Sequence, residues 1–354
     1  MAAPHAVFHP LRVARIDELT DDSVAITFDV PEELRDDYAF VHGQHLNIRG
    51  GDDVRRSYSL CTPPSSGVLR IGVKRLPGGA FSEGVVDRLQ IGDELEVMTP
   101  AGRFTTDLDP SSAKRYVVVA AGSGITPVLS IAAAILEGEP ASFITLVYAN
   151  RTSSSVMFLD EVHGLKDRFP ERFQIVHVLS REEQDVEVLS GRLDGERFGR
   201  LLDTLVPDRG VDDWFLCGPQ QMVDELRGVL TGRGVTRVHT ELFHADPVPR
   251  APVSALVDGT DGAAAVTIRL DGRASDLSLR PDGVSVLEAA LQVRGDLPFA
   301  CRGGVCGTCR ARLVEGTVQM DVNYALEPEE IERGYVLTCQ SHPTSAKVVL
   351  DYDA

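Results

Sequence analysis

The sequence has no long hydrophobic run and is short of positive charge. Although 43% of the 354 residues are hydrophobic, no apolar stretch approaches the length of about 20 residues that a membrane-spanning helix needs. The 35 Lys and Arg residues are outnumbered by 53 Asp and Glu residues, so the formal net charge is −18. A chain this acidic repels nucleic acid and anionic lipid. We therefore expect no membrane or nucleic-acid partner, and we look to small molecules and other proteins.

The length and the first residues narrow the class of protein further. A chain of 354 residues exceeds the size of one ordinary hydrophobic core, so we expect two or three domains. Residues 1–10 lack the charged segment followed by an apolar segment that is typical of a secretory signal peptide. These features predict a cytoplasmic protein, a compartment in which structural disulfides are uncommon.

Four of the six cysteines have the spacing of iron–sulfur ligands. Cys301, Cys306 and Cys309 form a C-x4-C-x2-C pattern, and Cys339 follows later in the chain. This is the plant-type spacing for a [2Fe–2S] cluster, in which two irons need four thiolates. Glycines between the ligands let the loop backbone approach the inorganic sulfides closely. A zinc site, which would more often contain paired C-x2-C units, and disulfides are the alternatives.

The segment around these cysteines has the pattern of a small β-grasp domain. Residues 266–270 alternate as a strand does, and Asp271-Gly272 predicts a hairpin turn. Ser285 is suited to cap a helix over residues 286–291. The sequence Cys-Arg-Gly-Gly-Val-Cys-Gly-Thr-Cys, with Thr-Cys-Gln near the end of the chain, closely resembles plant-type ferredoxins.

The middle of the chain predicts a doubly wound α/β domain. A buried strand over residues 116–120 is followed by the turn Ala-Gly-Ser-Gly-Ile-Thr-Pro and by a helical pattern. Further apolar strands alternate with helical stretches over residues 143–148, 173–179 and 214–216. In such sheets the ligand binds at the carboxyl ends of the strands, and a glycine-rich turn before a helix suits a pyrophosphate. Taken alone, the turn is equally compatible with a purely structural role.

The order of this turn and the later Cys-Gly-Pro resembles the ferredoxin–NADP reductase superfamily. The resemblance implies that a nicotinamide coenzyme binds here, with its pyrophosphate at the turn and its nicotinamide beside Cys-Gly-Pro. The residues concerned are Gly122, Gly124, Thr126 and Pro127 for the pyrophosphate, and Cys217 and Gly218 for the nicotinamide. Simple packing is the alternative for Cys217.

The choice of coenzyme depends on the end of the strand over residues 173–179. Ser180 and Arg181 follow this strand, where relatives that prefer NADP hold the 2′-phosphate. An arginine at this position can make charge-assisted hydrogen bonds to the phosphate. Because acidic residues follow Arg181, a solvated arginine is the alternative. We predict NADPH as the coenzyme.

The first third of the chain predicts a flavin-binding β-barrel. Residues 7–105 contain short alternating runs that are interrupted by Gly and Pro. Arg-Ser-Tyr-Ser-Leu resembles the flavin signature of the superfamily, which implies that Arg56 pairs with pyrophosphate, Tyr58 packs on the isoalloxazine and Ser59 approaches flavin N5. The resemblance implies further flavin contacts by Val73, Lys74, Gly79, Phe81 and Ser82, and the Gly-Gly-x-x-Ser pattern favours FAD over FMN. Taken alone, Tyr58 could equally be barrel core.

Glu-Leu-Phe at residues 241–243 ends the reductase portion. In relatives an aromatic residue near this point covers the other flavin face, so the resemblance makes Phe243 a candidate for that role and Glu241 a nearby acid. The candidate catalytic residues are Ser59, Cys217 and Glu241.

Three other features have less specific interpretations. We expect Cys61 to be a small buried hydrophobic residue, and His42 and His45 to lie on the barrel surface. Residues 313–332 contain six acids and no Lys or Arg. This acidic segment predicts either a docking surface for a basic partner or a solvated loop and helix start.

The predicted organisation is a flavin-binding β-barrel over residues 1–108, an NAD(P)-binding α/β domain over 109–244, a linker over 245–255 and a [2Fe–2S] ferredoxin domain over 256–354. Three prolines make the linker semi-rigid. The expected electron path runs from NADPH through FAD and the [2Fe–2S] cluster to an external acceptor.

The domain order resembles the reductases of multicomponent bacterial oxygenases over essentially the whole chain. Segments 8–11, 73–79, 155–158 and 333–340 resemble, more narrowly, the reductase subunits of phenylacetyl-CoA epoxidases. That resemblance implies a di-iron oxygenase component as the acceptor. The alternatives are the reductase of another oxygenase, such as a ring or steroid hydroxylase, and a non-catalytic redox sensor.

Overall fold

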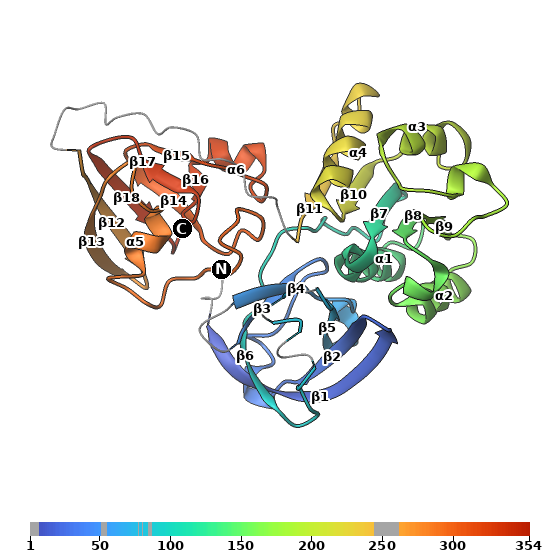
Figure 1. Cartoon of the computed structure of the whole chain (residues 1–354), viewed down its shortest axis with the longest axis horizontal. Coiled ribbons are helices and arrows are strands. Elements are labelled where there is room, and N and C mark those ends of the chain that lie inside the picture. Colours follow the sequence, from blue (N-terminus) through green and yellow to red (C-terminus); the bar gives the residue numbers. More distant parts are fainter. Residues whose placement is uncertain (1–6, 51–54, 77, 80, 84–86, 244–261) are drawn as a thin grey trace. The chain divides into compact units, whose positions relative to one another are not determined.

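The computed structural model describes residues 7–50, 55–76, 78–79, 81–83, 87–243 and 262–354 (Figure 1). These residues form two compact units, one over residues 7–243 and one at the C-terminus. The predicted linker over residues 245–255 lies outside the described residues. Within the described residues, no helix combines the length and the apolar character that crossing a membrane requires.

An antiparallel barrel occupies the first part of the larger unit. Its strands are β1 (Phe8–Thr20), β2 (Ser23–Asp29), β3 (His45–Arg49), β4 (Arg55–Ser59), β5 (Leu69–Lys74) and β6 (Glu94–Met98). They are hydrogen-bonded in the order β4-β3-β6-β1-β2-β5, and pairing of Leu60 with Ile71 joins the two ends of this sheet. Alternate side chains fill the barrel with aliphatic and aromatic groups. Cys61, which follows β4, is buried, as predicted.

His42 and His45 are buried, so the prediction that they lie on the barrel surface is wrong. The segment after β6 covers them: Ala101 exchanges two backbone hydrogen bonds with His45, and Thr105 contacts His42 Nε2 at 2.9 Å. His45 is 3% exposed, and burial lowers its pKa to about 4. The imidazole of His45 is therefore neutral at physiological pH. The covering segment lies more than fifty residues away in the sequence, and local polarity could not reveal it.

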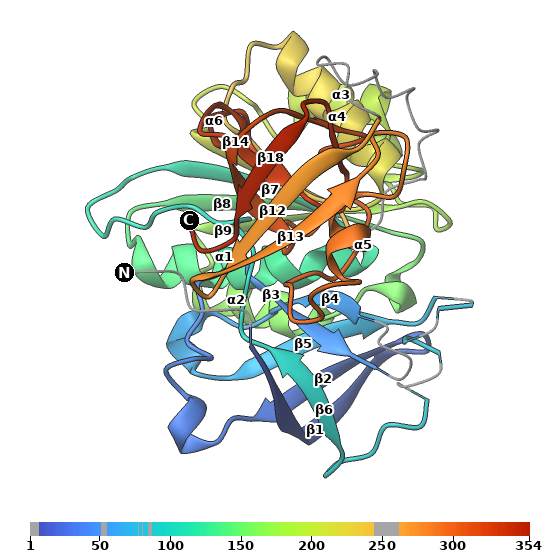
Figure 2. The same cartoon turned by 90° about the vertical axis from the view of Figure 1, so that its left-hand side faces the viewer.

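A parallel sheet with helices on both faces forms the rest of the larger unit. Its strands are β7 (Arg115–Ala121), β8 (Phe143–Asn150), β9 (Phe173–Leu179), β10 (Asp213–Cys217) and β11 (Val238–Glu241), and its helices are α1 (Ile125–Gly138), α2 (Leu159–Arg168), α3 (Gly195–Thr204) and α4 (Gln220–Gly232). The strand order is β11-β10-β7-β8-β9. Helices α1 and α2 cover one face, and α3 and α4 cover the other (Figures 1 and 2). The doubly wound fold is confirmed, and its topological switch point lies between β7 and β10.

The barrel and the α/β sheet pack directly against each other. A Cβ atom added at Gly72 in β5 would lie 2.5 Å from Thr126 Cγ2 in α1, so only glycine fits this contact. Ser130 in α1 donates a hydrogen bond of 2.6 Å to the carbonyl of Thr62. Arg70 in β5 forms a 2.9 Å ion pair with Glu161 in α2. These contacts hold the barrel against the α1 and α2 face of the sheet.

The C-terminal unit has the predicted β-grasp fold. Its elements are β12 (Ala264–Leu270), β13 (Arg273–Leu279), α5 (Val286–Ala290), β14 (Arg310–Glu315), β15 (Val318–Met320), α6 (Pro328–Glu332), β16 (Tyr335–Leu337), β17 (Ser341–Pro343) and β18 (Lys347–Asp351). The main sheet has the order β13-β12-β18-β14-β16, and β12 runs parallel to β18. Asp271 and Gly272 both have positive φ, as the predicted hairpin turn requires. Ser285 Oγ accepts a hydrogen bond from the Glu288 amide, which confirms the predicted helix cap.

Four of the six acids over residues 313–332 have partners inside the C-terminal unit. Glu330 is buried and forms a 2.6 Å ion pair with Arg310. Glu315 lies 2.8 Å from Lys347, and Asp321 contacts His342 at 3.1 Å. The Glu327 side chain accepts a hydrogen bond from the Glu330 backbone in a capping box at the start of α6. These four acids contribute to the fold, so a docking surface in this segment would depend mainly on Glu329 and Glu332.

Candidate functional site

All five strands of the parallel sheet end at one edge, and most of the predicted nucleotide residues lie there. The backbone register pairs Cys217 with Ala120 on one side and with Glu241 on the other. At the other end of the same edge, Asn150 pairs with Leu179. The glycine-rich turn, Gly218, Ser180 and Glu241 therefore come together because parallel strands share their carboxyl edge.

The glycine-rich turn is a 3-10 turn, η4 (Gly122–Gly124), between β7 and α1. Gly122 has φ 55°, a conformation that favours glycine. A Cβ atom at Gly124 would lie 2.2 Å from the carbonyl oxygen of Cys217, so the turn packs directly on the end of β10. The N-terminus of α1 consequently begins at the switch point of the sheet, where it suits an anion.

Thr126 and Pro127 are buried in the first turn of α1. Thr126 Oγ1 donates a 2.9 Å hydrogen bond to the carbonyl of Ser123 inside the turn. Because the Thr126 hydroxyl is used in this way, its observed role is to fix the shape of the turn. The groups suited to a pyrophosphate at this turn are backbone N–H groups and the positive end of the helix.

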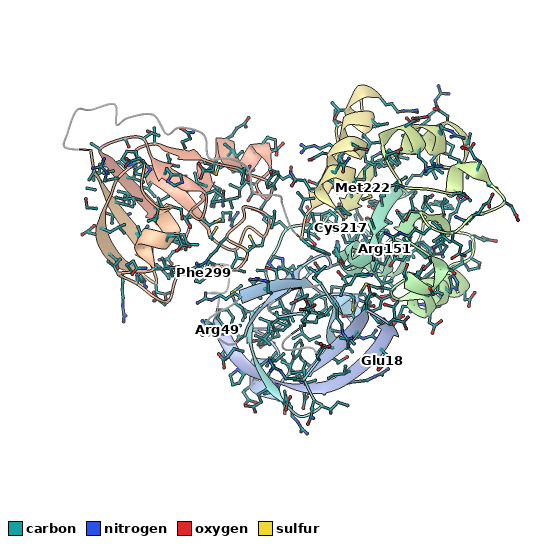
Figure 3. All side chains as sticks on the ribbon, in the orientation of Figure 1. Glu18, Arg49, Arg151, Cys217, Met222 and Phe299 are labelled. Atoms are coloured by element: carbon teal, nitrogen blue, oxygen red, sulfur yellow. The ribbon has the colours of Figure 1, made fainter. Side chains whose placement is uncertain are left out.

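Cys217 is fully buried at the end of β10, within the core that surrounds α1 (Figure 3). Burial raises the pKa of its thiol well above the usual value, so the side chain is an uncharged thiol. A Cβ atom at Gly218 would lie 2.6 Å from Met222 Cε. Because Gly218 has no side chain, Met222 of α4 can pack closely against this end of β10.

Ser180 and Arg181 are exposed at the end of β9. Their backbone amides donate to the carbonyls of Asn150 and Arg151 at 2.9 and 2.7 Å, so the chain after β9 runs alongside the chain after β8. A second arginine, Arg151 (Figure 3), therefore lies at the same edge as Arg181. Sequence reasoning did not single out Arg151; its signal was its position directly after a buried strand.

Glu182, the acidic residue that follows Arg181, is hydrogen-bonded to Ser153. Its carboxylate accepts hydrogen bonds from the Ser153 amide at 2.8 Å and from Ser153 Oγ at 2.9 Å. These contacts give its negative charge a local partner in the turn η5 (Ser153–Ser155). The acidic residue next to Arg181 therefore argues less strongly against a phosphate-binding role for that arginine.

The contact between Ser59 and Glu241 joins the barrel to the α/β sheet. Ser59 ends β4 and donates a 2.9 Å hydrogen bond to Glu241 Oε1 at the end of β11. Ser59 is buried and Glu241 is half-buried. Two of the three predicted catalytic residues are thus in direct contact, and the register between β10 and β11 pairs Glu241 with the third, Cys217.

The residues of the predicted flavin signature lie on β4, and their side chains alternate between the two faces of the strand. Tyr58 is half-buried with its ring 5.3 Å from that of Phe81, and Arg56 is exposed. Burial raises the pKa of Tyr58, so the phenol stays protonated and uncharged. The edge of the barrel therefore presents an uncharged aromatic ring near a guanidinium, a combination that fits a flavin ring and its pyrophosphate.

The other predicted flavin residues lie on β5 and the segment after it. Val73 is buried in the barrel core, and Lys74 forms a 3.1 Å ion pair with Asp22. A Cβ atom at Gly79 would lie 2.3 Å from Ser82 Oγ, which accepts a 3.1 Å hydrogen bond from the Leu76 amide. Only glycine therefore fits at position 79 beside Ser82, while the Val73 side chain points into the core.

Phe243 lies two residues after Glu241, at which β11 ends, and it is 38% exposed. The end of β11 therefore carries an accessible aromatic ring close in sequence to the Ser59 partner.

The four predicted ligand cysteines lie together in two pairs. Cys301 lies close to Cys306, and Cys309 lies close to Cys339. The Gly303 amide donates to Cys301 Sγ at 3.4 Å, a bond that favours a thiolate. The loop therefore already gathers its sulfur atoms with donors directed at them.

The paired arrangement fits two irons better than one metal ion. Each iron of a [2Fe–2S] cluster takes two of the four thiolates. The donor set and the glycine-rich loop thus suit a dinuclear cluster.

Family models match the chain in three successive regions. An oxidoreductase FAD-binding domain matches residues 10–106, an oxidoreductase NAD-binding domain matches residues 118–227, and a 2Fe-2S iron-sulfur cluster binding domain matches residues 268–344. The predicted cofactor classes, FAD, a nicotinamide coenzyme and a [2Fe–2S] cluster, are confirmed by these matches.

Similar proteins match this chain over nearly its whole length. The chain is 42% identical to one subunit of the 1,2-phenylacetyl-CoA epoxidase of Escherichia coli K12, covering 98% of each chain. It is 34% identical to the ferredoxin reductase component of 3-ketosteroid-9-alpha-monooxygenase from Rhodococcus rhodochrous, covering 97% of this chain and 96% of the other. The solved structure of phthalate dioxygenase reductase matches with a TM-score of 0.59 and 25% identity, covering 97% of this chain and 98% of the other. The chain therefore belongs to the ferredoxin–NADP reductase superfamily, within the family of electron-transfer reductases that join FAD-, NAD- and [2Fe–2S]-binding domains in one chain and serve as components of multicomponent oxygenases.

Proposed function

We propose that this reductase passes electrons from NADPH through FAD and its own [2Fe–2S] cluster to a di-iron oxygenase that acts on phenylacetyl-CoA. The observation that carries the proposal is the 42% identity to the phenylacetyl-CoA epoxidase component of Escherichia coli over 98% of both chains. The contact between Ser59 and Glu241 and the paired cysteines support the catalytic part of the proposal.

In this proposal the residues of the larger unit position the two reacting rings. When bound, FAD accepts a hydride from the nicotinamide and releases electrons singly to the cluster. The glycine-rich turn and the N-terminus of α1 hold the coenzyme pyrophosphate, while Cys217 and Gly218 lie beside the nicotinamide. Tyr58 and Phe243 would hold the isoalloxazine, and both would supply aromatic surface to it. Arg56 pairs with the flavin pyrophosphate.

Ser59 and Glu241 have complementary roles. The Glu241 carboxylate accepts the hydroxyl hydrogen of Ser59 and so fixes the direction of that hydroxyl. The oriented Ser59 hydroxyl would then be a polar contact for the flavin ring when FAD is bound. Because Glu241 is half-buried, it can also exchange a proton with water.

The preference for NADPH over NADH is assigned to Ser180 and Arg181. Replacing Arg181 with alanine removes charge-assisted hydrogen bonds to a 2′-phosphate, each worth about 1.5–3 kcal/mol. We expect kcat/KM for NADPH to fall about 10- to 100-fold, while kcat/KM for NADH changes little. Steady-state reduction of an artificial acceptor with each coenzyme measures both values.

Arg209→Ala is the matched control for this change. Arg209 is exposed in the loop that leads into β10, so it lies at the opposite edge of the sheet. An equal loss with NADPH and NADH in the Arg181 variant would contradict its role in binding the phosphate.

Reconstitution tests the proposed acceptor. The reductase is combined with the oxygenase components of a phenylacetyl-CoA epoxidase, NADPH and phenylacetyl-CoA, and the epoxide product is measured. Turnover that depends on the reductase is expected. The 34% identity to a ketosteroid monooxygenase reductase favours a second acceptor, a steroid hydroxylase. Electron transfer to that oxygenase, without transfer to the epoxidase, would overturn the proposed pathway and leave the reductase chemistry intact.

The domain boundaries and the compartment belong to the same proposal. We assign residues 1–108 to the flavin domain, 109–244 to the nicotinamide domain, 245–255 to a linker and 256–354 to the ferredoxin domain. All six cysteines are free thiols in the structure, which supports a reducing compartment such as the cytoplasm.

A further inference from the structure

The side-chain amide of Gln340 is directed at one of the proposed cluster ligands. Gln340 follows Cys339, and its Nε2 atom lies 3.6 Å from Cys339 Sγ as a hydrogen-bond donor. The same nitrogen donates a 2.8 Å hydrogen bond to the carbonyl of Arg302. A glutamine amide has two N–H groups, so both contacts can form at once and the second fixes the direction of the first.

The backbone and a glycine hold Gln340 in this position. The backbone amide of Gln340 donates a hydrogen bond to the Leu337 carbonyl, and the backbone carbonyl of Gln340 accepts one from the Asp321 amide, both at 2.9 Å. A Cβ atom at Gly304 would lie 3.2 Å from Gln340 Cγ, which is closer than an ordinary packing contact. The glycine in the cluster loop therefore leaves the space that the glutamine side chain occupies.

The carbonyl that accepts the hydrogen bond from the Gln340 side chain belongs to Arg302, a residue with a strained backbone conformation. Arg302 has φ 54°, a left-handed conformation that is uncommon for a residue with a side chain. Its guanidinium lies 4.6 Å from the centre of the Phe299 ring (Figure 3) and forms a 2.9 Å ion pair with Glu288 in α5. These contacts anchor Arg302, so its carbonyl stays aimed at the Gln340 amide.

We propose that Gln340 is a positioning residue that raises the reduction potential of the [2Fe–2S] cluster through its hydrogen bond to Cys339. The inference rests on the proposed assignment of Cys339 as a ligand. One-electron reduction adds negative charge to the cluster and its thiolates. An N–H donor stabilises the more negative form more strongly, so this bond favours the reduced state.

Gln340→Leu tests the proposal because leucine has a similar length and lacks the amide. Loss of one hydrogen bond to a charged sulfur is expected to shift the ratio of reduced to oxidised cluster about tenfold toward the oxidised form. A tenfold change is 59 mV for a one-electron couple. The midpoint potential is measured on the full-length protein by a redox titration monitored by EPR.

The control is Gln292→Leu, which removes an exposed amide in the same unit after α5. Its potential should equal that of the parent protein. A Gln340→Leu protein with an intact cluster signal and an unchanged potential would overturn the inference. A parent protein with no cluster signal would instead refute the proposed function.

A measurement on the parent protein covers the case in which the leucine variant fails to assemble its cluster. Protein labelled with ¹⁵N in its glutamine side-chain amides is reduced and examined by pulsed EPR. A weak ¹⁵N coupling to the reduced cluster is expected from the Gln340 amide. Absence of that coupling would contradict the hydrogen bond and with it the proposed tuning.

Discussion

Replacing Cys339 with serine is expected to abolish the EPR signal of the reduced cluster and to lower reduction of one-electron protein acceptors to background. Cys339 supplies one sulfur of the pair with Cys309, and serine does not offer the soft thiolate that iron–sulfur clusters require. Reduction of the flavin by NADPH should persist, because the flavin and nicotinamide residues all lie in the larger unit. Anaerobic stopped-flow absorption and EPR on the same sample measure both effects.

Cys61→Ala provides the matched control, since Cys61 is also a buried free thiol. It packs in the core that surrounds α1, and burial raises the pKa of its thiol to about 12, so it is a neutral packing group. The alanine protein should keep its cluster signal and its acceptor reduction. A Cys339→Ser protein with a normal cluster signal would show that another residue completes the ligand set.

Ser59→Ala is expected to slow reduction of the flavin by NADPH about 10²- to 10⁴-fold, the usual contribution of a positioned acid or base group. The change removes the hydroxyl that Glu241 orients at the junction of barrel and sheet. Affinity for NADPH should change little, because Ser59 is not among the residues proposed to hold the coenzyme. Single-turnover stopped-flow absorption at several NADPH concentrations separates the rate of reduction from binding.

Ser57→Ala is the control for this substitution. Ser57 lies on the same strand, and its hydroxyl donates a 2.6 Å hydrogen bond to Asn47 inside the barrel. The Ser57 variant should reduce its flavin at the parent rate. If the two serine variants behaved alike, Ser59 would have a structural role and not a catalytic one.

The structural elements that the sequence predicted correctly are determined by residues that lie close together in the chain. The run of valines in β7 and the glycine-rich turn after it predict a buried strand and a helix start, and both are present. Likewise Ser285 caps α5, and Asp271-Gly272 forms the turn between β12 and β13. In each case short-range backbone preferences and the apolar pattern carry the necessary information.

The features that the sequence did not reveal depend on contacts between distant segments. Ser59 and Glu241 are 182 positions apart, and only the packing of barrel against sheet brings them together. The burial of His45 depends on the segment after β6, and the direction of the Gln340 amide depends on Arg302 in the cluster loop. Local patterns do not encode such tertiary contacts, so the candidate residues could be named but their partners could not.

The electron path is the central claim, and one anaerobic titration of the purified protein with NADPH tests it most directly. Visible and EPR spectra are recorded together as NADPH is added. The proposed path predicts that the flavin absorption bleaches and that the EPR signal of a reduced [2Fe–2S] cluster grows in the same titration. Bleaching of the flavin with no cluster signal, in a protein whose cluster is reduced by dithionite, would contradict the path from flavin to cluster.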